Sequence, residues 1–217
     1  MIGLVSKYQT LGLHIGIQDK EIRKGDEGMK ILITLLLLLI IFPSSAGCAI
    51  THKYGPYYGK VVEAETKEPI EEAAVLVVFY TEEYGPAGAI TRYADALETV
   101  TDKNGEFRIP AHRVTTFRPL QGWDLYGYFT IFKPGYGYYP IHKDVKPKFV
   151  PGGTLPTNQY VMIELPRLKT KEERLNMPSV NFDIPYEKQK RFIELINQEL
   201  ERLRATGKYS KESFGRR

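Results

Sequence analysis

The residues best suited to chemistry are few in this 217-residue chain. It has one cysteine, Cys48, and four histidines, of which His52, His112 and His142 follow that cysteine. A lone thiol has no disulfide partner within its own chain, and a zinc site needs several ligands. No histidine stands in a His-x-x-Glu or His-x-His arrangement, and no Gly-x-Ser-x-Gly, P-loop or dinucleotide motif is present. The sequence therefore predicts no metal, no cofactor and no catalytic residue.

The position of Cys48 suggests a different role for it. It follows the apolar run 31–42, which is interrupted only by Thr34 and preceded by the basic start Met29-Lys30. About 20 apolar residues are needed to cross a bilayer, whereas 7 to 15 behind a basic start are typical of a secretory signal. The pattern therefore predicts a signal peptide over residues 29–48.

Residues 1–28 are mixed and polar, which does not fit a signal peptide. We expect either a mis-assigned upstream start or a disordered tail there, with translation beginning at Met29. A cytoplasmic tail before a signal anchor is the alternative.

The end of this signal, Ala46-Gly47-Cys48, resembles the lipobox of bacterial lipoproteins. The resemblance implies that the Cys48 sulfur carries a diacylglycerol, that Cys48 is the first mature residue, and that the partner is a membrane held through this lipid anchor. Ser45 stands where the family has an aliphatic residue, so ordinary cleavage between small residues remains the alternative. Ala49 replaces the aspartate that retains many lipoproteins at the inner membrane. The resemblance thus implies an outer-membrane lipoprotein that faces the periplasm or the cell surface.

Charge and composition limit the partners. The chain has 30 Lys and Arg against 26 Asp and Glu, a net charge of +4, and the two signs are interspersed. A nucleic-acid-binding surface would need its basic residues massed on one face, so nucleic acid is not an expected partner. Fifteen tyrosines, many of them beside glycine, favour strands and tight turns over a helical bundle.

The elements that position these residues are predicted to be strands. Alternating residues around Val61 and the uninterrupted apolar run Ala73–Tyr80 indicate two strands, the second buried on both faces. Asn104-Gly105 predicts a β-hairpin over 97–110. Two more strands are expected, one broken at Pro134-Gly135 and one ending at Pro166. After a linker at 49–57, the pattern predicts a β-sandwich over 58–168 with no helix interposed.

The C-terminal part has a helical pattern. After a linker at 169–184, Phe192, Ile196, Leu200 and Leu203 recur at spacings that place them on one face of a helix over 185–206. We expect this face to pack on the parent domain; docking on a separate partner is the alternative. Residues 207–217 are expected to form a tail.

Three segments in order resemble the carboxypeptidase regulatory-like domain: "GKVVEAETKEPIEEAAV", "TVTDKNGEFRIP" and "FTIFKPGY". The matching positions are Gly59, Val61, Thr66, Pro69, Ile70, Ala73, Thr101, Asp102, Gly105, Phe107, Gly135 and Tyr136. Lys67 and Glu72 stand where glycine is usual in the family, and residues 82–96 and 112–124 look like long insertions. The resemblance implies a prealbumin-like sandwich of about seven strands, in a module that is usually accessory or adhesive. Enzymes on transthyretin-like sandwiches exist, so a hydrolytic or metal-dependent enzyme is the alternative.

A tyrosine-rich stretch is the best candidate for ligand binding. Trp123, Tyr126, Tyr136 and Tyr138 crowd one region of sequence, and aromatic faces stack on sugar rings or on aliphatic side chains of a partner. Cross-strand pairing that only stabilises the sheet is the alternative. The sequence as a whole predicts a non-catalytic cell-envelope lipoprotein, mainly β, whose sandwich binds or scaffolds a glycan or an envelope protein at the membrane surface.

Overall fold

The computed structural model describes residues 30–37, 50–85, 88–118, 121–204 and 208–214. The chain divides into two compact units, Met1–Gly47 and Cys48–Arg217. In the first unit, residues 30–37 form a helix with exposed side chains. Residues 1–28, the rest of the predicted signal peptide and Cys48 lie outside the described residues. No helix in the described part of the chain has both the length and the apolar character needed to cross a membrane.

The second unit is mainly β, as predicted. Its described strands are β1 (Thr51–Tyr54), β2 (Tyr57–Glu63), β3 (Ala74–Gly85), β4 (Gly88–Val100), β5 (Glu106–Ile109), β6 (His112–Thr115), β7 (Gly122–Trp123), β8 (Tyr128–Phe132) and β9 (Tyr160–Leu165). The helices are α2 (Lys171–Leu175) and α3 (Lys190–Arg202), with 3-10 turns η1 (Tyr186–Lys188) and η2 (Lys211–Phe214).

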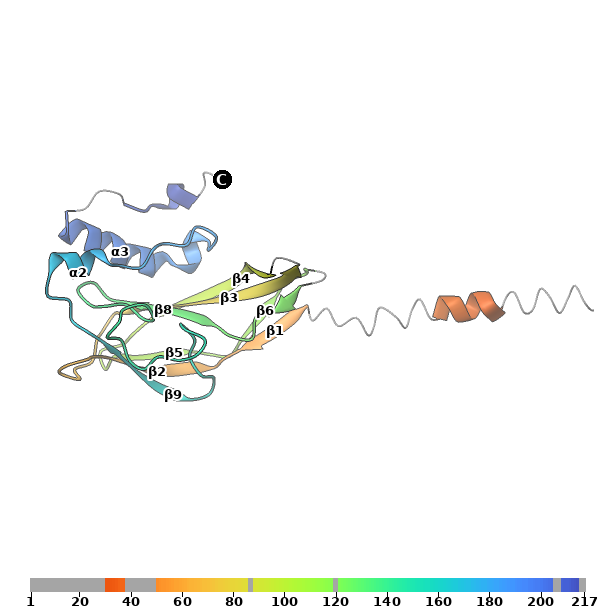
Figure 1. Cartoon of the computed structure of the whole chain (residues 1–217), viewed down its shortest axis with the longest axis horizontal. Helices are drawn as coiled ribbons and strands as arrows, with labels where there is room; N and C mark the ends of the chain where they lie inside the picture. The colour runs from red at the N-terminus through yellow and green to blue at the C-terminus, as the bar shows by residue number, and fades with distance from the viewer. Residues whose placement is uncertain (1–29, 38–49, 86–87, 119–120, 205–207, 215–217) are drawn as a thin grey trace, which may run out of the picture. The chain divides into compact units, whose positions relative to one another are not determined.

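These strands form three sheets (Figure 1). In the first sheet, β2 lies between β5, to which it is antiparallel, and β9, to which it is parallel. In the second, β3 pairs antiparallel with β4 along its whole length and with β7 and β8 on its other edge. The third is the short antiparallel pair β1–β6.

The β5–β2–β9 and β4–β3–β8 sheets face each other across one hydrophobic core, which we call the inter-sheet cluster. Its members on strands are Tyr54, Tyr57, Val61, Val75, Val77, Phe79, Phe107, Ile109, Val114, Phe129, Ile131, Val161, Ile163 and Leu165. All of them are buried, so this cluster supplies most of the burial that stabilises the unit.

β3 is the central strand, as its uninterrupted apolar sequence predicts. The odd-numbered residues from Val75 to Phe79 belong to the inter-sheet cluster. The even-numbered residues from Ala74 to Val78 belong to a second core on the opposite face of the sheet, the helix-side cluster. A strand that is covered on both faces needs apolar residues at every position, which explains the run.

Helix α3 covers the second face of this sheet. The helix-side cluster comprises Ala74, Leu76, Val78, Ala96, Phe132, Val180, Ile184, Phe192, Ile193, Leu195 and Ile196. The rings of Phe132 and Phe192 meet edge to face, with centroids 6.2 Å apart. The apolar stripe of the C-terminal helix thus packs on its parent domain, and α3 is shorter than the predicted range 185–206.

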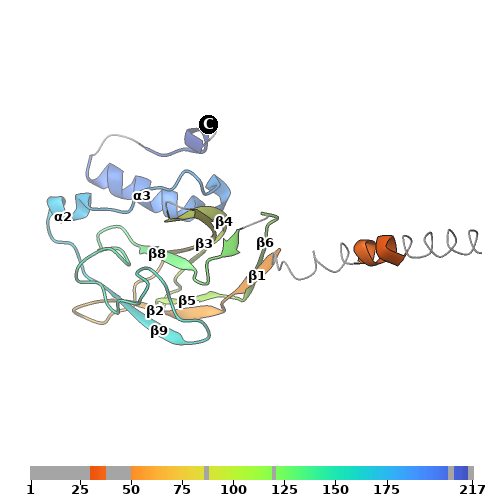
Figure 2. The same ribbon diagram turned by 45° about the vertical axis from the view of Figure 1, so that its right-hand side comes forward.

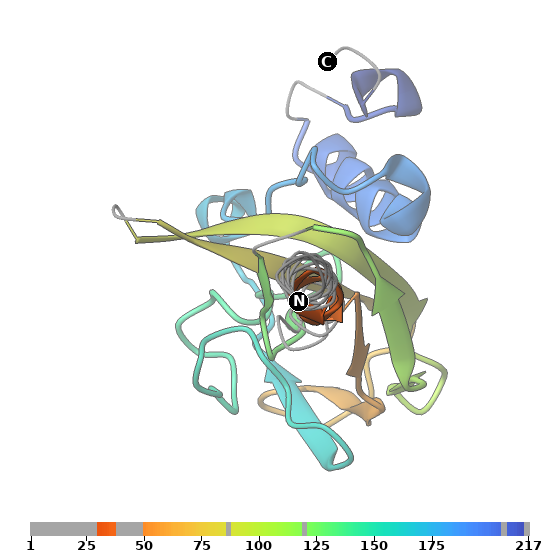
Figure 3. The same cartoon turned by 90° about the vertical axis from the view of Figure 1, so that its right-hand side faces the viewer.

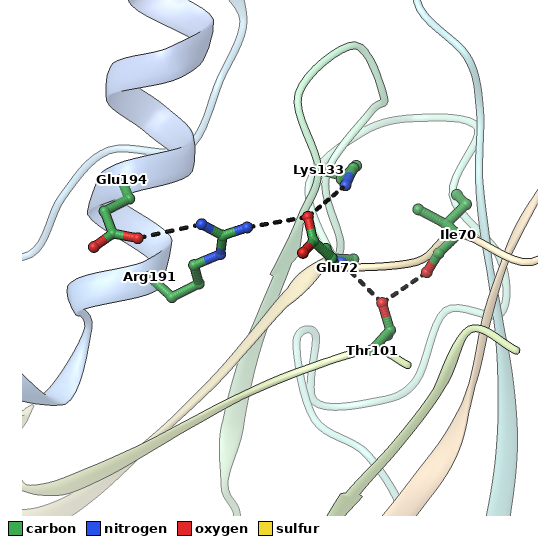
Figure 4. A network of polar contacts seen from close by, with 7 residues as sticks. Ile70, Glu72, Thr101, Lys133, Arg191 and Glu194 are labelled. Atoms are coloured by element: carbon green, nitrogen blue, oxygen red, sulfur yellow. Dashed lines mark hydrogen bonds and ion pairs between the residues drawn. The ribbon is translucent and has the colours of Figure 1, made fainter. Parts of the chain in front are cut away.

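Polar contacts fix the start of α3 on the sheet. The Glu98 carboxylate of β4 accepts hydrogen bonds from the backbone N–H groups of Arg191 (2.9 Å) and Phe192 (2.6 Å), which have no partner within the helix. The Arg191 guanidinium bridges Glu194 on its own helix and Glu72 beside β3, both at 3.2 Å (Figure 4). Lys133 approaches the same Glu72 carboxylate.

The turn at Asn104-Gly105 does not form the predicted hairpin over 97–110. β4 pairs with β3 and β5 pairs with β2, so the turn carries the chain from one sheet to the other. A two-residue type I′ hairpin turn needs positive φ at both central residues, whereas here only Gly105 has it, at +75°. The Asp102 carboxylate closes the turn instead, accepting from the backbone N–H groups of Asn104 and Glu106.

Several segments predicted to be linkers, insertions or a tail contain strands or helices. The predicted linker 49–57 contains β1 and the start of β2, and the predicted linker 169–184 contains α2. The insertion at 82–96 is the outer part of the long β3–β4 hairpin, and the one at 112–124 contains β6 and β7. The predicted tail 207–217 contains η2. These elements are short or polar, so their pattern alone does not distinguish them from loops.

Candidate binding site

Trp123 of the predicted aromatic site lies in β7 and packs against the inter-sheet cluster. Its indole is 5.8 Å from the His52 ring and 6.4 Å from the Tyr54 ring, both on β1. Partial burial there lowers the pKa of His52. This grouping fastens β1 to the edge of the second sheet.

Tyr136 lies elsewhere, in a polar group that joins the ends of β2 and β9. Its hydroxyl accepts a hydrogen bond from Arg167 (2.9 Å), whose guanidinium lies over the Tyr136 ring. The same guanidinium makes two hydrogen bonds to the buried carboxylate of Glu63, at 3.1 and 2.9 Å. These hydrogen bonds lower the pKa of Glu63 and keep it ionised.

The other predicted aromatics take part in further groupings. Tyr138 packs against the helix-side cluster, and Tyr126 is exposed on the turn after β7. Tyr139 is fully buried and donates to the Thr154 carbonyl, and the Tyr128 ring meets Tyr80 edge to face. The predicted aromatic residues therefore form no single site: some pack on one core, some on the other, and Tyr126 is exposed.

A different pair of tyrosines lies side by side on the outer face of the β5–β2–β9 sheet. Tyr58 of β2 and Tyr160 of β9 are register partners, and their ring centroids are 6.4 Å apart at an interplanar angle of 50°. Tyr160 is 51% exposed, and Tyr58 is half-buried. They line a shallow groove of about 490 Å³. Its other lining residues are Pro56, Gly59, Asp102, Glu106, Phe107, Arg108 and Asn158.

Polar groups surround the two rings. The Tyr160 hydroxyl donates to the Glu106 carboxylate (3.3 Å), and partial burial together with that carboxylate raises the pKa of Tyr160. Glu106, Arg108 and Asp102 are exposed at the rim. Asn158 closes one end, where its backbone N–H donates to the Pro56 carbonyl. The groove thus offers two aromatic faces, two carboxylates and a guanidinium to a polar ligand.

Gly59 allows this groove to form. A Cβ at this position would lie 2.2 Å from the Val161 carbonyl oxygen, so a larger residue would force β2 and β9 apart. Gly59 is the register partner of Val161 and directly follows Tyr58, so the spacing of Tyr58 and Tyr160 depends on this close approach. The resemblance to the carboxypeptidase regulatory-like domain includes Gly59, but nothing in the sequence indicates that Tyr58 and Tyr160 are neighbours.

The histidines lie apart from this groove. The His112 Nε2 contacts the Asp95 carboxylate at 2.8 Å, and Lys188 contacts the other oxygen of that carboxylate at 3.0 Å. His142 lines a second groove, of about 630 Å³, with Asp144 4.0 Å away. Within the described residues, no group of three or more His, Cys, Asp or Glu side chains is arranged to hold a metal ion.

Comparisons with known proteins find no match to this chain among family models, curated proteins or solved structures. The function is therefore inferred from the sequence and geometry of the chain itself.

Proposed function

We propose that the chain is a non-catalytic lipoprotein of the bacterial cell envelope, whose β-sandwich binds a glycan at the groove between Tyr58 and Tyr160. The single observation that carries the proposal is the adjacent tyrosine pair on the outer face of the sheet, with carboxylates and a guanidinium around it. Aromatic faces stack on the C–H faces of sugars, while charged groups at the rim bond the sugar hydroxyls. The groove is shallow, which suits a chain of sugars better than it suits a small molecule that needs an enclosed pocket.

Support for the prealbumin-like sandwich comes from the backbone at two departures from the family pattern. Lys67 and Glu72, which replace the usual glycines, have φ of 61° and 55°. Positive φ is the conformation for which glycine is favoured, so both positions have the backbone conformation expected of the glycines that the resemblance implies there. The family's Thr101 and Gly105 also have structural roles, at the end of β4 and in the turn between the sheets.

Support for the anchor is the sequence before the second unit. The helix at 30–37 exposes the apolar side chains of a signal h-region, and Cys48 precedes the first described residue of the folded unit by two positions. We place the protein at the outer membrane, facing the periplasm or the cell surface, because Ala49 follows the cysteine. A lipid on Cys48 holds the groove within reach of envelope glycans.

The proposal is tested with residues 49–217 on arrays of envelope glycans, followed by calorimetric titration of the best ligand. Tyr160→Ala removes one stacking face and is expected to weaken binding at least about tenfold. Tyr126→Ala is the matched control, because Tyr126 is also an exposed tyrosine and belongs to the site predicted from sequence.

Either of two results would overturn the assignment. One is that the wild-type segment captures no glycan. The other is that Tyr126→Ala weakens binding as much as Tyr160→Ala does, which would move the site to the stretch around Trp123.

A further inference from the structure

The folded unit begins much closer to Cys48 than the sequence predicts. Because β1 starts at Thr51, only residues 49 and 50 separate Cys48 from an ordered strand, in place of the predicted nine-residue linker. A residue spans at most about 3.6 Å, so Cys48 lies within roughly 7 Å of Ile50. A lipid at Cys48, which the proposed function requires, would therefore hold this end of the unit directly against the bilayer.

This end of the unit exposes apolar side chains. Ile50 and Phe117 lie together, because the Thr116 N–H donates to the Ile50 carbonyl, and they are 48% and 74% exposed. The outer part of the β3–β4 hairpin reaches the same end (Figures 1 and 2). It exposes Tyr84 (72%) and Ile90 (57%). Figure 3, which looks at this end, shows the hairpin extending to one side of β1 and β6. Tyr84 is the register partner of Ala89 and Ile90 is that of Glu83, so the two apolar side chains project from opposite faces of this hairpin.

Two exposed basic side chains lie on β1 and β6 at this end of the unit. Lys53 of β1 and Arg113 of β6 are directly opposite register partners, both exposed. No ion pair involves either side chain in the described part of the chain. Like charges directly opposite each other on neighbouring strands destabilise the pairing. An anion that bound both would remove this repulsion.

We propose that this end, formed by Ile50, Tyr84, Ile90, Phe117, Lys53 and Arg113, docks on an anionic lipid surface. The apolar side chains enter the interfacial region, and the two cations contact lipid phosphates, as in other peripheral membrane surfaces. The inference rests on the proposed anchor for its biological setting. The contact itself needs no lipid on Cys48, so the two claims can be tested separately.

The test uses residues 49–217, which lack Cys48 and the apolar run. Both core clusters lie within residues 54–214, so this segment contains its entire hydrophobic core. It is floated with vesicles of phosphatidylglycerol and phosphatidylcholine, and with vesicles of phosphatidylcholine alone. We expect flotation with the anionic vesicles only, with loss at high salt because the attraction is screened.

Paired variants assign the contact to this end. Lys53→Glu with Arg113→Glu is expected to reduce binding at least about tenfold, since each basic residue at an anionic surface contributes to attachment. Lys103→Glu with Lys148→Glu makes the same change in net charge at exposed positions elsewhere and should bind as the wild type does. Phe117→Ser should also weaken binding, whereas Ile141→Ser, in the groove beside Glu65 and Lys169, should not.

The proposal is overturned if the wild-type segment stays unbound with anionic vesicles, or if both charge-reversed pairs lose binding equally. Retention of full binding by the Lys53, Arg113 pair variant would likewise contradict it. These outcomes leave the anchor untouched, because Cys48 is absent from every protein in the experiment. Circular dichroism of each variant separates lost docking from lost folding.

Discussion

Single side chains fix the segments that flank the strands, and Thr101 illustrates how. Its buried hydroxyl donates to the Ile70 carbonyl (2.6 Å) and accepts from the Ala73 N–H (2.8 Å), tying the end of β4 to the segment before β3 (Figure 4). Both backbone groups would be unpaired without it, in a position closed to water. The sequence identified Thr101 by resemblance alone, and the structure supplies the reason for it.

Thr101→Val is therefore expected to lower the free energy of unfolding by about 2 to 4 kcal/mol, because it leaves two buried backbone groups unsatisfied at nearly constant volume. Urea denaturation measures the loss. Thr101→Ser keeps the hydroxyl and should recover most of the stability. A Thr101→Val variant that is as stable as the wild type, or no less stable than Thr101→Ser, would contradict this role of the hydroxyl.

Lys67 provides a second test at the residue scale. Its φ of 61° is strained for a residue with a Cβ, and its side chain is mainly exposed, with an ion pair to Glu164. Lys67→Gly should raise the free energy of unfolding by about 0.5 to 1 kcal/mol, since relief of this strain exceeds the added freedom of the unfolded chain. The matched change Lys103→Gly, at a position without positive φ, should lower it. A destabilised Lys67→Gly would show that the ion pair outweighs the strain.

At the scale of elements, local sequence pattern predicted the strands that are covered on both faces and little about which strands pair. The run Ala73–Tyr80 identified β3 because double burial leaves no polar position. Asn104-Gly105 correctly predicted a turn. The prediction that the two flanking strands pair with each other was wrong, because the residues of a turn do not determine which sheet each flanking strand joins. The Tyr58–Tyr160 groove was not predicted, because it forms where strands about a hundred residues apart pair in parallel.

The attachment of α2 to α3 was also invisible in the sequence. The Arg174 guanidinium makes two hydrogen bonds, of 2.7 and 2.9 Å, to the Glu199 carboxylate, which is 1% exposed. Removing one partner of a buried pair leaves an uncompensated charge. Glu199 follows Phe192 by seven residues and Ile196 by three, so the helical periodicity places it on the buried face of α3. The periodicity does not indicate that Arg174 is its partner.

Arg174→Met is expected to cost roughly 3 to 5 kcal/mol, seen as a lower midpoint in thermal or chemical denaturation. Arg174→Met combined with Glu199→Leu removes both charges and should recover much of that loss, because no buried charge remains. If the double variant is as unstable as the single one, then Arg174 stabilises the helices by packing alone.

At the scale of the whole molecule, three proposals are linked: a glycan-binding face, a lipid-facing end and a lipid anchor. The first two belong to one folded unit and are tested on it directly. The anchor would determine where the other two act, because a domain held within a few residues of a bilayer is close to both envelope glycans and lipid. The location of the protein and the purpose of its lipid-facing end thus depend on Cys48.

The most direct test of the account is intact-mass and N-terminal peptide analysis of the protein isolated from bacterial membranes. We predict a mature chain that begins at Cys48 and carries a diacylglyceryl group on its sulfur, with no residue of the segment 1–47 retained. Cys48→Ser should abolish this modification and leave the protein outside the detergent phase. A mature chain that begins elsewhere, or an unmodified Cys48 thiol in the membrane-bound protein, would contradict the account.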